Sequence, residues 1–111
     1  MTDHTAELAR RESAARLAIK NGFDMEDEDS GAAMFVAFHL EELAADYWRQ
    51  HLRTARPAPS GVLDILVLSE HWGGPDEMDN LDFSLPGEVT EYVISVRFDE
   101  AGGIAEISME S

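Results

Sequence analysis

The stretch EYVISVRFDEAGGIAEISM, residues 91–109, decides the fold. Its first half alternates large apolar side chains with smaller or charged ones, Tyr92, Ile94, Val96 and Phe98 against Val93, Ser95 and Arg97. Such alternation is typical of a strand that is buried on one face. The glycine-rich segment Asp99-Glu100-Ala101-Gly102-Gly103 has the composition of a hairpin turn, and Ile104, Ile107 and Met109 follow it. The stretch therefore predicts a β-hairpin.

The residues that precede this hairpin predict further strand structure. Residues 81–85 (LDFSL) again alternate apolar and polar side chains, and Pro86-Gly87 ends the run. Residues 65–68 (ILVL) form an apolar run suited to a central strand, although helix through Leu68 is an open alternative for residues 62–68. Ser60 is the expected cap of a short helical turn that reaches Asp64.

Two helices are expected in the N-terminal half of the chain. Residues 5–20 are rich in Ala, Glu and Arg, and Asn21-Gly22 supplies a C-cap. The apolar stripe of this first helix is thin, which predicts that residues 1–22 dock loosely; it consists of Leu8, Ala15, Leu17 and Ile19. The chain is thus predicted to be a single α+β domain over residues 1–111, with two N-terminal helices followed by a three-stranded antiparallel meander.

The second helix is expected over residues 32–53. Apolar side chains recur there at spacings of three and four, namely Val36, Leu40, Leu43, Ala44 and Tyr47. The additional aromatic residues Phe35, Phe38 and Trp48 exceed what one sheet face requires. We expect the surplus to contact the first helix or a second subunit.

The charge of the chain limits its partners. There are 23 acidic residues against 8 Lys and Arg, and residues 57–111 hold 12 of the acids but a single base, Arg97. Such a surface repels nucleic acid and anionic lipid and attracts cationic partners, so neither nucleic acid nor a membrane is an expected partner. The absence of cysteine and of an apolar signal region predicts a soluble, cytoplasmic protein.

Two acidic segments are the expected contact surface for a partner. The first contains Glu26, Asp27, Glu28 and Asp29, and the second contains Asp76, Glu77 and Asp79. The spacing of an EF-hand is absent from the first segment, because Asp29 stands where glycine is required. The sequence therefore favours solvated acidic loops over a metal site.

Histidine and carboxylate side chains offer two further candidate sites. His39, Glu42 and Asp46 have the spacing of one helix face and could meet a divalent metal, although a solvent-facing stripe is the favoured interpretation. Glu70-His71-Trp72 combines a histidine with a carboxylate that could perform acid–base chemistry, but no nucleophile motif accompanies it. No catalytic residue, metal ligand or cofactor is assigned on this basis.

The C-terminal third, LDFSLPGEVTEYVISVRFDEAGGIAEISMES from Leu81 onward, resembles small acidic bacterial proteins of unknown function. The shared pattern is a strand, a Pro-Gly turn and a hairpin that closes on Met-Glu-Ser. The resemblance carries no catalytic motif and implies no activity, but it points to a bacterial cytoplasmic protein.

Three functions are compatible with these observations. The favoured one is a non-catalytic module that binds a basic partner, as small acidic immunity proteins and antitoxins do. The second is a homodimeric structural or regulatory protein that pairs through residues 32–53. The third is a divalent-metal-binding protein.

Overall fold

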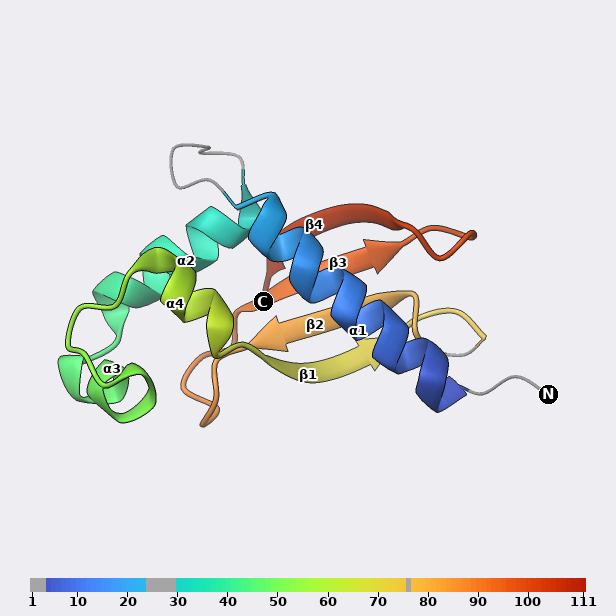
Figure 1. Cartoon of the computed structure of the whole chain (residues 1–111). Coiled ribbons are helices and arrows are strands. Elements are labelled where there is room, and N and C mark those ends of the chain that lie inside the picture. Colours follow the sequence, from blue (N-terminus) through green and yellow to red (C-terminus); the bar gives the residue numbers. More distant parts are fainter. Residues whose placement is uncertain (1–3, 24–29, 76) are drawn as a thin grey trace.

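Helices come first along the chain and strands follow (Figure 1). The computed structural model describes residues 4–23, 30–75 and 77–111. In that part of the chain the elements are α1 (His4–Asn21), α2 (Gly31–Glu42), α3 (Ala45–Leu52), α4 (Pro59–Asp64), β1 (Val67–Trp72), β2 (Asn80–Ser84), β3 (Val93–Phe98) and β4 (Ile104–Glu110). The predicted α+β class with an antiparallel meander is confirmed, with four strands in order β1-β2-β3-β4 where three were expected.

The predicted hairpin is β3–β4. The backbone amide of Asp99 donates to the carbonyl of Gly103 at 2.8 Å, and the Asp99 carboxylate accepts from the amides of Ala101 and Gly103 at 2.9 Å each. The register shifts by a bulge between Arg97 and Phe98. This shift explains why the apolar side chains of the last strand are spaced unevenly along the sequence.

Helix α1 lies across one face of the sheet, and α2, α3 and α4 lie toward one end of it (Figure 1). The apolar half of each alternation points to that face, and its side chains join those of α2 in the core. Phe35 and Val36 of α2 are fully buried there, together with Leu81, Phe83, Ile94 and Val96 of the sheet. Helix α2 packs mainly on the outer strand β4.

Arginine side chains supplement the thin apolar stripe of α1. Ala15 and Ile19 are buried, but Leu17 is 61% exposed. The Arg11 guanidinium lies 5.1 Å from the centre of the Phe98 ring and donates to the carbonyl of Met78 at 2.8 Å. The Arg16 guanidinium likewise lies 5.1 Å from the centre of the Phe83 ring, and it donates to a backbone carbonyl of the loop before β1. In these contacts the arginine stems bury apolar length and their heads satisfy carbonyl groups. The loose docking of residues 1–22 stays a prediction.

The single helix predicted over residues 32–53 is wrong. It breaks at Leu43 and Ala44, both of which have extended backbones, with ψ of 141° and 153°. On a continuous helix Trp48 would lie about 220° around the axis from Phe35, so only one of the two could face the core. Both are buried in the structure because the break reorients α3. Tyr47 then donates its hydroxyl hydrogen to the carbonyl of Pro86 at 2.8 Å, which ties α3 to the β2–β3 connection.

Residues 62–68, for which helix and strand were both open alternatives, contain parts of both. Helix α4 ends at Asp64 and β1 begins at Val67. Two details of the sequence interpretation are wrong. The N-cap of α4 is Ala58 rather than Ser60, because Pro59 starts the helix, and β1 is an edge strand rather than a central one. None of the helices in the described ranges is long and apolar enough to cross a membrane.

Candidate functional site

The sheet face opposite the helices presents the polar half of each alternation. Strand register places these residues in two rows, each of which crosses all four strands. The first row is Glu70, Asp82, Ser95 and Ser108, and the second is Trp72, Asn80, Arg97 and Glu106. These rows, with Glu91, Val93, Glu110 and Ser111, line a broad hollow of about 560 Å³, which we call the acidic hollow.

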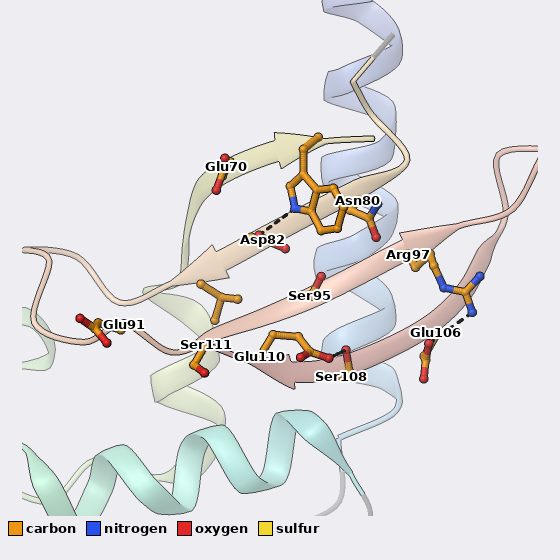
Figure 2. Close-up of a pocket in the computed structure, with 12 residues that line it drawn as sticks. Glu70, Asn80, Asp82, Glu91, Ser95, Arg97, Glu106, Ser108, Glu110 and Ser111 are labelled. Carbon is orange, nitrogen blue, oxygen red and sulfur yellow. Dashed lines mark hydrogen bonds and ion pairs between the residues drawn. The ribbon is translucent and has the colours of Figure 1, made fainter. Parts of the chain in front are cut away.

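Small side chains at the centre of this face create the hollow. Ser95 and Ser108 pair across β3 and β4, and larger side chains from the outer positions surround them (Figure 2). Ser95 is buried even though it points to the open side of the sheet. Strand pairing holds the backbone beneath these residues, although the register shifts beside two of the lining residues, Glu70 and Arg97.

Negative charge dominates the acidic hollow. Among its described lining residues five carry a carboxylate, and the one base is Arg97. Arg97 is paired, because its Nη2 lies 3.2 Å from Oε2 of Glu106 (Figure 2). Four of the five carboxylates belong to exposed residues; Asp82 is partly buried. Their field acts on ions in solution and weakens as salt screens it.

An exposed aromatic ring lies within the acidic hollow. Trp72 is 47% exposed, and its indole N–H donates to Oδ2 of Asp82 at 3.0 Å. The contact is a diagonal one, since Trp72 pairs with Asn80 and Asp82 is two residues farther along the same strand. The second carboxylate oxygen, Asp82 Oδ1, is buried and has no hydrogen-bond partner within the described residues.

The acidic segments chosen from the sequence lie elsewhere or outside the described residues. Glu77 and Asp79 belong to the β1–β2 connection, and neither is among the residues that line the acidic hollow. Asp79 lies 3.9 Å from Nη1 of Arg11 on α1. The structure does not describe the remaining members of the predicted surface, Glu26, Asp27, Glu28, Asp29 and Asp76.

The interpretation of His39 as part of a solvent stripe is wrong, because the residue is fully buried. Its Nδ1 lies 2.7 Å from the carbonyl oxygen of Phe35, and its Nε2 lies 2.9 Å from the hydroxyl of Thr90. A carbonyl can only accept, so Nδ1 carries the hydrogen, and in the neutral ring Nε2 accepts from Thr90. Glu42 and Asp46 are exposed, and no group of three or more potential metal ligands occurs in the described part of the chain.

Burial lowers the pKa of His39, and its hydrogen bond to Phe35 and the charge of Glu42 only partly oppose this effect. The unfolded chain therefore takes up a proton at this position more readily than the folded protein. Stability from this group is present above the ordinary histidine pKa near 6.5 and is lost as the pH falls toward the lowered value, by at most about 1.4 kcal/mol per pH unit. We expect a His39→Gln variant, although less stable at pH 7.5, to lose less further stability between pH 7.5 and 5 than the wild-type protein.

Urea unfolding followed by circular dichroism across this pH range measures the difference. The matched control is His71→Gln, which removes a histidine at an exposed position and leaves the core intact. Equal slopes of unfolding free energy against pH for the wild-type protein and the His39→Gln variant would contradict the expectation.

In the second histidine candidate, the side chains of His71 and Glu70 lie on opposite faces of the sheet. Glu70 lines the acidic hollow, whereas its neighbour His71 pairs with Leu81, which faces the helices. Adjacent strand residues point to opposite faces, so the Glu70 carboxylate and the imidazole do not converge. Nδ1 of His71 lies 2.8 Å from the carbonyl oxygen of Glu77 and holds the β1–β2 connection.

No protein family model, no curated protein and no solved structure matches this chain. The acidic hollow therefore has to be judged on its own geometry. Its residues were present in the sequence as the polar half of the strand alternation, at positions such as Asp82 and Ser95. The sequence analysis did not identify these residues as a site, because the carboxylates of a sheet face are scattered along the chain and form no contiguous acidic run.

Proposed function

We propose that this protein is a non-catalytic binding module that docks a basic partner protein on the acidic hollow. The observation that carries the proposal is a sheet face that no described element covers. Its described lining residues include five carboxylates and one base, Arg97, which is already ion-paired. A partner that presents several lysine or arginine side chains would neutralise this charge and would be drawn to it from a distance. Immunity proteins and antitoxins that cover the cationic surface of an enzyme work in this way.

The shape of the acidic hollow supports a macromolecular partner. It extends across all four strands and is open to solvent, unlike the enclosed, mainly apolar cavities that hold small molecules. Its floor consists of strand backbone with small side chains, on which a protein surface can lie without rearrangement.

Charge placement, rather than total charge, is the property to test. The double variant Glu70→Gln/Glu110→Gln removes two carboxylates from the acidic hollow, and Glu41→Gln/Glu100→Gln removes two exposed carboxylates outside it. Affinity capture from the source-cell lysate at low salt would supply a basic partner, whose purified form is then titrated with each variant. We expect the first variant to weaken binding up to about thirtyfold, since exposed ion pairs contribute up to about 1 kcal/mol each and two carboxylates are removed.

The control variant is expected to bind within about twofold of the wild-type protein. Binding of the wild-type protein should also weaken steeply between low and high salt. Equal losses for the two double variants would show that only net charge matters and would overturn the assignment of the partner to this face.

Pairing of two copies through residues 32–53 stays a prediction. Additional aromatic residues in this segment suggested the pairing, but two of them, Phe35 and Trp48, are buried within the chain and so cannot contact a second copy. Met34 and Phe38, at 45% and 37% exposure, are the large apolar side chains that α2 leaves on the surface.

A further inference from the structure

We infer that Trp72 is the position at which an arginine side chain of the basic partner stacks. The inference rests on the proposed function, and it names the side chain that the acidic hollow selects. It would make the hollow specific for arginine rather than for positive charge in general.

The indole of Trp72 is held in place and is still open to a ligand. Its N–H is already used by Asp82, so the face of the ring is what it offers to a partner. The hydrogen bond to a carboxylate fixes the ring orientation before binding, which reduces the entropy lost when a partner docks. Nearly half of the side chain remains exposed.

The surroundings of the ring favour a cation. Glu70 and Asp82 flank Trp72 on β1 and β2, and Glu70 is exposed. Tryptophan binds cations on its face better than the other aromatic residues do. Stacking by a nucleic-acid base is disfavoured, because its phosphates would enter a hollow lined by five carboxylates.

A planar guanidinium fits this arrangement better than an ammonium group. It stacks flat on an aromatic ring while its edge N–H groups remain free to reach carboxylates beside the ring. The chain already uses this contact twice on its covered face, where Arg11 and Arg16 lie over phenylalanine rings. Arg97, in the same row as Trp72, instead pairs with Glu106 on the far side of the hollow.

Two peptides of equal charge, hexa-arginine and hexa-lysine, separate the stacking contact from simple attraction. Trp48 is 1% exposed, so acrylamide quenching of tryptophan fluorescence reports on Trp72, the other of the two tryptophans. We expect hexa-arginine to protect Trp72 from quenching and to bind about two- to fivefold more tightly than hexa-lysine at low salt. Calorimetric titration of a Trp72→Leu variant should show equal affinity for the two peptides.

The control is Tyr92→Leu, which removes an exposed aromatic ring that does not line the acidic hollow and should keep the arginine preference. Equal binding of both peptides to the wild-type protein, with Trp72 still quenched, would overturn the inference and leave the proposed function standing. Failure of both peptides to bind at low salt would overturn the inference and the proposed function together.

Discussion

Replacing Trp48 with alanine is expected to lower the free energy of unfolding by about 3–5 kcal/mol. Trp48 is 1% exposed, and the other residues of α3, all described, are partly or fully exposed. Its ring meets that of Tyr47 edge to face, with centroids 5.1 Å apart. Removal of the indole leaves a cavity and takes away the main apolar contact of α3 with the core.

Urea unfolding monitored by circular dichroism measures the loss, and the second tryptophan supplies a matched control. Trp72→Ala removes an identical side chain from an exposed position and should change stability by less than about 1 kcal/mol. A Trp48→Phe variant should fall between the two, because the buried indole N–H has no hydrogen-bond partner among the described residues and its removal leaves no acceptor unpaired. Similar stability for both alanine variants would contradict the packing of α3.

A methyl group at Gly31 is also expected to destabilise the protein, with a smaller loss of about 1–3 kcal/mol. Gly31 opens α2 where this helix crosses β4, and a Cβ there would lie 2.7 Å from the backbone nitrogen of Met109 and from the carbonyl carbon of Ser108. Backbone atoms of a paired strand cannot move aside as a flexible side chain can. Gly31→Ala must therefore push α2 away from the sheet or distort β4.

Gly61→Ala is the matched control for this substitution. A Cβ at Gly61 would lie 3.8 Å from the side chain of Leu52, which is an ordinary contact, and alanine favours helix over glycine by up to about 1 kcal/mol. We expect Gly61→Ala to keep or raise the melting temperature and Gly31→Ala to lower it. Equal melting temperatures for the two variants would show that α2 does not approach β4 so closely.

Local patterns predicted the strands better than the helices. Alternation of apolar and polar side chains is set by the two-residue repeat of a strand, so residues 81–85 and 91–109 could be read without knowledge of the rest of the chain. The break at Leu43 carries no glycine or proline to announce it. It exists because Phe35 and Trp48 both reach the core, and that requirement depends on the position of the sheet.

The candidate site was only partly accessible from the sequence. Charge composition pointed to a cationic partner, and it did so through the excess of acids after residue 57. The acidic hollow brings Glu70, Asp82 and Glu106 onto one face from three different strands, and sequence spacing gives no measure of that proximity. His39 shows the same limit, since its partner Thr90 is 51 residues away.

By itself, then, the sequence determined the α+β class, the hairpin at its C-terminal end and the negative sign of the chain's own net charge, because each follows from local periodicity or from a sum over residues. Only the tertiary structure decided which face of the sheet stays uncovered, where α2 ends, and that Trp72 lies beside Asp82. These features arise from contacts between segments far apart in the chain. The free energy of each such contact depends on the distance in space between its side chains, and no local sequence pattern encodes that distance.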